Sequence, residues 1–173
     1  HEFRAGAMLL ETCFESHQDA VPVEVTTHQN WPADNLEILD GADAIVFYND
    51  ATKIVENGWD KVDALAAEGK GLMFMHYAVH PDEETGEKYF KRWMGGYFRN
   101  GQSVNPFWKA KIEGLVGHPT SRGYEGSETI DEYYHSFEFT TEVPVDQIGL
   151  ATPTTDNLVT INNLWTEAGA ETV

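Results

Sequence analysis

The stretch GLMFMHYAVH, residues 71–80, decides the fold that the sequence predicts. Its first five residues are glycine and apolar side chains, which indicate a buried strand. The chain then turns polar at once, with His76 and Tyr77 directly after the strand and His80 just before a proline. In open α/β sheets, ligands bind and chemistry takes place at the carboxyl ends of the strands. This position makes His76 the first candidate for a functional residue.

Predicted helices and strands alternate on both sides of this stretch. Apolar residues at three- and four-residue spacing predict helices over 2–19, 54–68 and 83–94. Short apolar or alternating runs predict strands at 22–27, 43–48 and 71–75. Further strands are expected in WKAKIEGL (108–115), YYHSFEF (133–139) and DQIGLATPT (146–154). The alternation of strand and helix predicts an α/β fold, with a parallel sheet covered by helices on both faces.

The chain opens directly with a predicted helix. In a flavodoxin-like strand order, a first strand precedes this helix and lies between the strands at 22–27 and 43–48. We therefore expect that the first strand and a closing segment are absent from this chain, or that internal segments are missing and the numbering runs on across them. The alternative is an irregular fold. The length of 173 residues fits one domain, residues 1–173.

Composition and charge exclude several classes of protein. The formal net charge is −18, from 29 acidic and 11 basic residues, which argues against a nucleic-acid or anionic-membrane partner. No apolar run approaches the ~20 residues of a membrane span, and no signal peptide is visible. We expect a soluble protein, cytoplasmic or exported, and leave homo-oligomer formation open. The single cysteine, Cys13, lies on the apolar face of the first helix and is expected in the core.

Seven segments of the chain carry a resemblance to a known family. They are HEFRAG (1–6), LDGADAIVFYND (39–50), GKGLMFMHYAVH (69–80), GGYF (95–98), SVNPFW (103–108), HPTSRG (118–123) and DEYYHSFEF (131–139). In this order they resemble the trehalose-utilisation (ThuA-like) family. The resemblance implies a class I glutamine amidotransferase-like, flavodoxin-like three-layer sandwich and a role in carbohydrate metabolism, on a sugar or keto-sugar. Members of the family usually begin with a strand before the HEF motif and end with a Gly-His-rich segment and a closing helix, which this chain lacks.

The turn after the strand at 71–75 decides which chemistry to expect. In amidotransferases of this fold it is a nucleophile elbow that carries a cysteine. Here it reads HYAVH, residues 76–80, without Cys or Ser, and no GxSxG occurs in the chain. Glutaminase and serine-esterase chemistry are therefore not expected. His76 is predicted to act as a general acid or base, the alternative being a histidine that only caps the strand.

The segment IDEYYHSFEF, residues 130–139, is the second candidate for the site. Strand alternation places Glu132, Tyr134 and Ser136 on one side, and Asp131, Tyr133, His135 and Phe137 on the other. We expect Asp131 and Glu132 to be the catalytic partners of His76. The alternative is a solvated acidic loop that leads into an edge strand.

Two further interpretations concern ligands. His1, His76 and His135 are residue types that bind a divalent metal, but no motif such as HxxxH or HExxH places them together, so a metal stays open and no cofactor is assigned. A small-molecule carbohydrate needs aromatic faces and a few convergent polar groups. The candidates for this role are Tyr77, Phe98, Arg99, Asn105, Trp108 and Tyr133. The alternatives are an ordered surface loop at 95–108 and, for the whole protein, a non-catalytic carbohydrate-binding or structural interaction domain.

Overall fold

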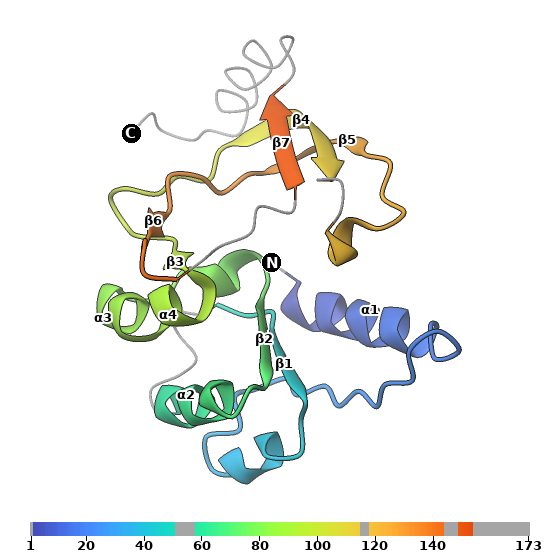
Figure 1. The fold of residues 1–173 in the computed structure, drawn as a ribbon, viewed down its shortest axis with the longest axis vertical. Helices are drawn as coiled ribbons and strands as arrows, with labels where there is room; N and C mark the ends of the chain where they lie inside the picture. Colours follow the sequence, from blue (N-terminus) through green and yellow to red (C-terminus); the bar gives the residue numbers. More distant parts are fainter. Residues whose placement is uncertain (1, 51–57, 115–117, 144–148, 154–173) are drawn as a thin grey trace.

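A computed structural model describes residues 2–50, 58–114, 118–143 and 149–153 of the chain. The protein is a mixed structure of helices and small parallel and antiparallel sheets. Figure 1 shows the strands β1 and β2 among helices α1, α2, α3 and α4, with β4, β5 and β7 above them. No helix in the described ranges is long and apolar enough to cross a membrane.

The central element is a pair of parallel strands. β1 (Ala44–Phe47) and β2 (Gly71–Phe74) pair residue by residue from Ala44 with Gly71 to Phe47 with Phe74. The rings of Phe47 and Phe74 stack with their centroids 4.9 Å apart. This pairing confirms the parallel arrangement predicted for 43–48 and 71–75.

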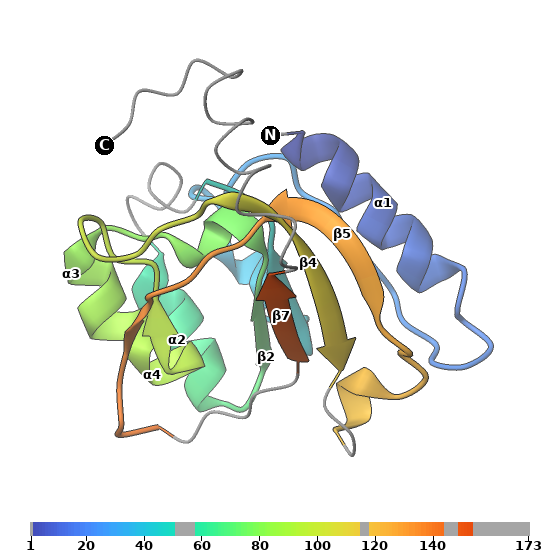
Figure 2. The same ribbon diagram turned by 90° about the horizontal axis from the view of Figure 1, so that it is seen from above.

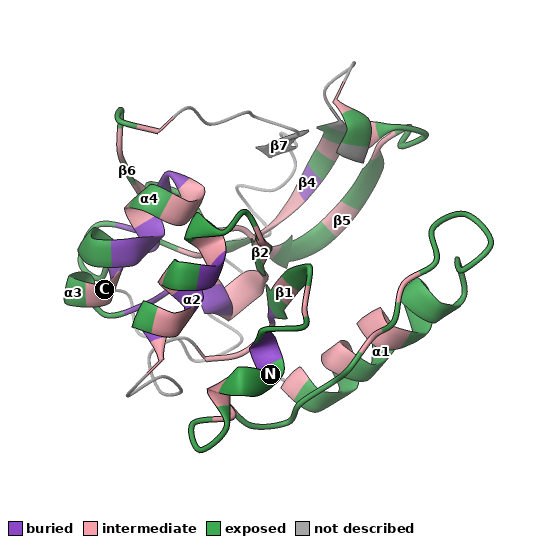
Figure 3. Cartoon of the chain, turned by 60° about the horizontal axis from the view of Figure 1, so that its bottom comes forward, coloured by how far each residue is buried: buried purple, intermediate pink, exposed green. Residues whose placement is uncertain are grey.

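Helix α2 (Trp59–Ala67) supplies the best-packed face of the core. Trp59, Val62 and Leu65 recur at three-residue spacing and are all buried, which confirms a helix in the described part of the range predicted, 54–68. Figure 3 shows the buried residues gathered around α2, α3 and α4. The core of the molecule therefore lies on one face of the β1–β2 pair.

The segment 22–27, which was predicted to be a third parallel strand, is not a strand. It runs beside α1 (Phe3–Glu15), where the Thr27 hydroxyl donates a hydrogen bond of 2.9 Å to the Glu11 carboxylate. A strand needs a partner about 4.7–4.9 Å away, but a pocket separates Val25 and Thr27 from β1. Within the described residues, β1 pairs with β2 alone. The strands therefore form small separate sheets, and the continuous sheet of a flavodoxin-like sandwich is not confirmed.

Helix α1 lies at one side of the molecule, as Figure 2 shows from above. None of its residues is buried, and Cys13, which was expected in the core, is exposed. The physical reason is that, among the described residues, a pocket separates the Leu10 and Phe14 side of this helix from β1, so its side chains have little to pack against. Phe3, at its start, meets the Tyr48 ring edge-on at 5.5 Å.

The helix predicted over 83–94 is present but has three parts. α3 (Glu83–Thr85) leads into the π-helical turn η3 (Gly86–Phe90) and then α4 (Lys91–Met94). The Asp82 side chain caps its start by accepting a hydrogen bond from the backbone of Thr85. Gly95, at φ 78°, ends it in the left-handed conformation that glycine adopts without steric cost.

The second half of the chain forms antiparallel sheets. β4 (Phe107–Gly114) lies between β5 (Ser127–Glu132) and β7 (Gly149–Pro153), and β3 (Gly96–Tyr97) pairs with β6 (Glu138–Phe139). The strands predicted at 108–115 and 146–154 correspond to β4 and β7. Of the strand predicted at 133–139, only the last two residues form a strand, β6, because β5 ends at Glu132 and the chain crosses between the two. Ser136, at φ 58°, interrupts the extended backbone of this crossing. Short 3-10 turns complete the fold: η1 (Leu36–Leu39), η2 (His76–Val79) and η4 (Pro119–Ser121).

Candidate functional site

The backbone presents His76 at the carboxyl end of β2. Met75 is still extended, and His76 opens the 3-10 turn η2 with φ 52°. Few residues other than glycine adopt a positive φ, and such strain costs about 1–3 kcal/mol, which the surrounding structure must offset. A strained turn from a strand into a helix is the geometry of a nucleophile elbow. His76 therefore has a strained conformation of the kind found at such an elbow.

Both ring nitrogens of His76 have a partner. Nε2 lies 3.2 Å from Oε2 of Glu132, and Nδ1 lies 3.3 Å from the hydroxyl of Tyr134. The tautomer that donates from Nε2 to the carboxylate accepts from Tyr134 at Nδ1. The three side chains therefore form a continuous series of carboxylate, imidazole and phenol.

The Glu132 carboxylate, at one end of this series, has a further hydrogen-bond donor in Asn105. Asn105 donates a hydrogen bond of 2.6 Å from Nδ2 to Oε1 of Glu132. The Glu132 side chain is 11% exposed, whereas that of His76 is 29% exposed. Glu132 is thus the inner end of the series, and His76 lies nearer to solvent. Asn105, which was expected to bind a sugar, instead fixes the orientation of Glu132.

Tyr134 was not among the residues predicted for the site. Its ring meets His76 edge-on at 5.3 Å and lies 5.3 Å from the ring of Phe98. Burial, followed by the nearby Glu132 carboxylate, raises the pKa of the Tyr134 hydroxyl. The signal that could have found it is strand alternation, which puts Tyr134 on the same side as Glu132.

The carboxylate that reaches His76 is Glu132 and not Asp131, although both were predicted. Asp131 is exposed, and its carboxylate accepts a hydrogen bond of 2.8 Å from the backbone N–H of Glu132. Neighbouring residues of a strand point to opposite sides, so only one of the two can face β2. Asp131 therefore shapes the end of β5 without contacting the imidazole.

The other side of this segment carries an aromatic stack. Trp108 lies 5.2 Å from Tyr133, with the rings 7° from parallel, and 5.6 Å from the His135 ring. The predicted alternation thus holds as far as His135, with Tyr133 and His135 opposite the residues that face His76, whereas Phe137 lies near Phe98, as Tyr134 does. Trp108 and Tyr133, both predicted sugar-binding residues, contact each other here.

The remaining sugar-binding candidates have structural contacts of their own. Phe98 is buried, at 6% exposure, with its ring 4.3 Å from that of His80. Arg99 pairs with the carboxylates of Glu83 and Glu138. Tyr77 meets the ring of His80 edge-on at 5.2 Å. Phe98 therefore supports Tyr134 from the core, and its ring does not present an open face for a sugar.

The part of the chain that is described holds no group of side chains that could bind a metal ion. Across residues 2–50, 58–114, 118–143 and 149–153, no three His, Cys, Asp or Glu side chains are placed to hold an ion together. His1 lies outside the described residues. His76 contacts Glu132, whereas His135 stacks on Trp108 on the other side of the segment.

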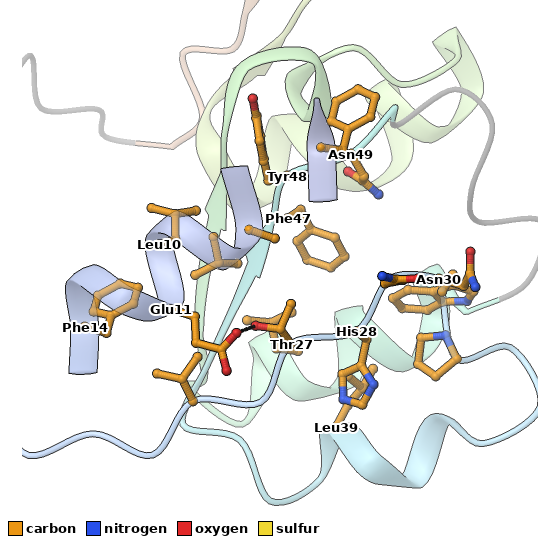
Figure 4. Close-up of a pocket in the computed structure, with 18 residues that line it drawn as sticks. Leu10, Glu11, Phe14, Thr27, His28, Asn30, Leu39, Phe47, Tyr48 and Asn49 are labelled. Carbon is orange, nitrogen blue, oxygen red and sulfur yellow. Dashed lines mark hydrogen bonds between the residues drawn. The ribbon is translucent and has the colours of Figure 1, made fainter. Parts of the chain in front are cut away.

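A pocket of about 270 Å³ lies away from His76, between α1, residues 25–32 and β1. Figure 4 shows Leu10 and Phe14 of α1 on one wall and Phe47, Tyr48 and Asn49 on another. His76 does not line it. The pocket lies between Val25 and Thr27 on one side and β1 on the other.

Comparison of the chain with family models, with curated proteins and with solved structures found no match. Function must therefore be inferred from the site itself. A carboxylate that accepts from one imidazole nitrogen orients the ring, and a hydroxyl on the other nitrogen can then exchange a proton with it. The arrangement of Glu132, His76 and Tyr134 is suited to proton transfer.

Proposed function

We propose that the protein is an enzyme of carbohydrate metabolism of the ThuA-like type, which acts on a sugar or keto-sugar with His76 as its central acid/base group. The main support is the 3.2 Å contact between Nε2 of His76 and Oε2 of Glu132. A histidine that served only to cap β2 would not need an oriented carboxylate. The strained φ of 52° gives a second support, because strained residues cluster at functional sites.

The alternative is a carbohydrate-binding domain without catalysis. One observation favours it: both ring nitrogens of His76 already contact side chains, at 3.2 and 3.3 Å. In this case the imidazole would hold Glu132 and Tyr134 in place for hydrogen bonds to sugar hydroxyls. The two functions differ in whether a bound sugar is changed.

A sugar panel separates the two functions. The wild-type protein is incubated with neutral di- and keto-sugars, and binding is measured by calorimetry and conversion by NMR. In His76→Gln, an enzyme should lose roughly 10²–10⁴-fold in rate while affinity changes little. His17→Gln is the matched control, since His17 is exposed just beyond the end of α1 and its ring contacts the neighbouring Ser16 hydroxyl and Cys13 carbonyl.

The outcomes are distinct. Conversion that His76→Gln removes and His17→Gln retains would support the enzyme. Binding without conversion would leave the carbohydrate-binding domain. Absence of binding to every sugar of the panel would overturn both.

A further inference from the structure

A carboxylate and a phenol hydroxyl meet the two nitrogens of one imidazole. Glu132 lies at Nε2 of His76 and the Tyr134 hydroxyl lies at Nδ1. Both groups lie within 3.3 Å of the same five-membered ring. The acidic and the basic end of the series are therefore close to each other, and both are in contact with His76.

This pairing matches the needs of one kind of substrate. A carbonyl compound with a hydrogen on the neighbouring carbon is enolised when a base removes that hydrogen while an acid protonates the carbonyl oxygen. The two atoms are close together in the substrate, so base and acid must also be close together. A carboxylate can take the proton from carbon, and a phenol hydroxyl can give one to the carbonyl oxygen.

The surroundings favour a substrate without charge. Glu132 and Asp131 place two carboxyl groups at the end of β5, and the guanidinium of Arg99 is held by Glu83 and Glu138. The chain as a whole carries a formal charge of −18. A phosphate or carboxylate on the substrate would be repelled by this charge.

We propose that the site enolises an uncharged α-hydroxy-ketone sugar, with Glu132 as the base, Tyr134 as the acid and His76 as the group that holds both. This inference rests on the proposed function and names its substrate class and its two further catalytic residues.

The proposed step is balanced without an oxidant or reductant. The Glu132 carboxylate takes the hydrogen on the carbon next to the carbonyl as a proton, and the electron pair of that C–H bond forms the C=C bond of the enediol. The π electrons of the C=O bond move to the oxygen, which takes the proton of the Tyr134 hydroxyl. The negative charge thus passes from Glu132 to the Tyr134 oxygen, and the phenolate regains a proton from solvent, so no proton is taken from His76, which donates from Nε2 to Glu132. When Glu132 exchanges its proton with solvent before the step reverses, the ketone returns with a solvent hydrogen on carbon.

This step can be measured without knowledge of the final product. D-Fructose is the neutral probe and fructose 6-phosphate the charged one, each incubated with the protein in D₂O. Loss of the ¹H NMR signals of the hydrogens next to the carbonyl reports the exchange. Sugar binding is measured separately by calorimetry.

The variants test each role. Tyr134→Phe and Glu132→Gln should each slow the exchange by roughly 10²–10⁴-fold while fructose still binds. Tyr134→Phe keeps the ring that packs on Phe98, and circular dichroism shows whether each variant is folded. Tyr124→Phe is the control, because Tyr124 is exposed and its hydroxyl forms a hydrogen bond with the Ser127 hydroxyl.

Each of the other possible results would overturn one part of the proposal. Exchange at the wild-type rate in Tyr134→Phe would remove Tyr134 as the acid. Fructose that binds without exchange would overturn enolisation and leave the proposed function standing. Equal exchange of fructose 6-phosphate would overturn the substrate class. If neither sugar binds, the proposed function fails as well.

Discussion

The Tyr134 hydroxyl lies 3.3 Å from Nδ1 of His76, although 58 residues separate the two in the chain. One residue opens the turn after a parallel strand, and the other follows an antiparallel strand of a different sheet. Their contact joins the two halves of the protein at the site. Variants near this contact should therefore affect both stability and function.

The Asn105 side chain should stabilise the inner end of the site. Asn105→Ala removes the donor to Oε1 of Glu132 and leaves a poorly exposed carboxylate with one partner fewer. We expect the free energy of unfolding to fall by about 1–3 kcal/mol, as measured by urea denaturation. Asn30→Ala is the control, because Asn30 is exposed. An equal loss in both variants would show that the contact with Glu132 contributes nothing specific.

Gly86 should tolerate no side chain. A Cβ atom there would lie 2.4 Å from the ring of Tyr97, which is fully buried. Gly86→Ala should therefore destabilise the protein by about 1–3 kcal/mol through overpacking. At Gly41 a Cβ would meet nothing within 4 Å, so Gly41→Ala should change stability much less. Thermal unfolding of the two variants tests the difference, and similar melting temperatures would contradict it.

Trp108 should contribute to stability through its stack with Tyr133 and His135. Loss of the ring in Trp108→Ala should lower the free energy of unfolding by about 2–3 kcal/mol, from lost burial and lost aromatic pairing. Phe107→Ala is the control, because Phe107, the residue next to Trp108, is 48% exposed. An unchanged stability of Trp108→Ala would show that the stack is not a structural element.

The same variant tests whether Trp108 also binds a sugar. Stacking of a sugar on its ring predicts a loss of roughly 1–3 kcal/mol in binding free energy, as for burial of a large apolar side chain. Calorimetry with the sugar panel measures it. Unchanged affinity in a folded Trp108→Ala protein would remove this residue from the binding site.

Alkaline pH should destabilise the protein through its buried tyrosines. Burial, and then a hydrogen bond to the Glu87 carboxylate, raises the pKa of Tyr97, whereas a tyrosine in the unfolded chain titrates near pH 10. Above about pH 10 the unfolded chain loses a proton that the folded protein keeps. The stabilisation is therefore complete below this pH, and the free energy of unfolding falls as the pH rises further.

Urea denaturation between pH 8 and pH 11 measures this dependence. Tyr97→Phe should flatten the alkaline decrease, because it removes one of the groups with a raised pKa. Tyr124→Phe replaces an exposed tyrosine and should leave the slope as in the wild type. A slope that Tyr97→Phe does not change would show that other groups cause the loss.

Local periodicity was sufficient for several features of the fold and the site. The apolar run at 71–75 predicted β2 and placed His76 at its carboxyl end, and the three-residue spacing from Trp59 to Leu65 predicted the buried face of α2. Strand alternation also placed Glu132 and Tyr134 together on one side. These features depend on the backbone geometry of a single helix or strand, which neighbouring residues specify.

Only the tertiary structure decided which of these residues meet. It brought Glu132 rather than Asp131 to His76, added Tyr134 to the site and placed Phe98 in the core. It also left residues 22–27 unpaired with β1, although their alternation is typical of a strand. Strand pairing and side-chain contact depend on partners distant in the chain, and their position is set by the packing of whole elements, which no local pattern records.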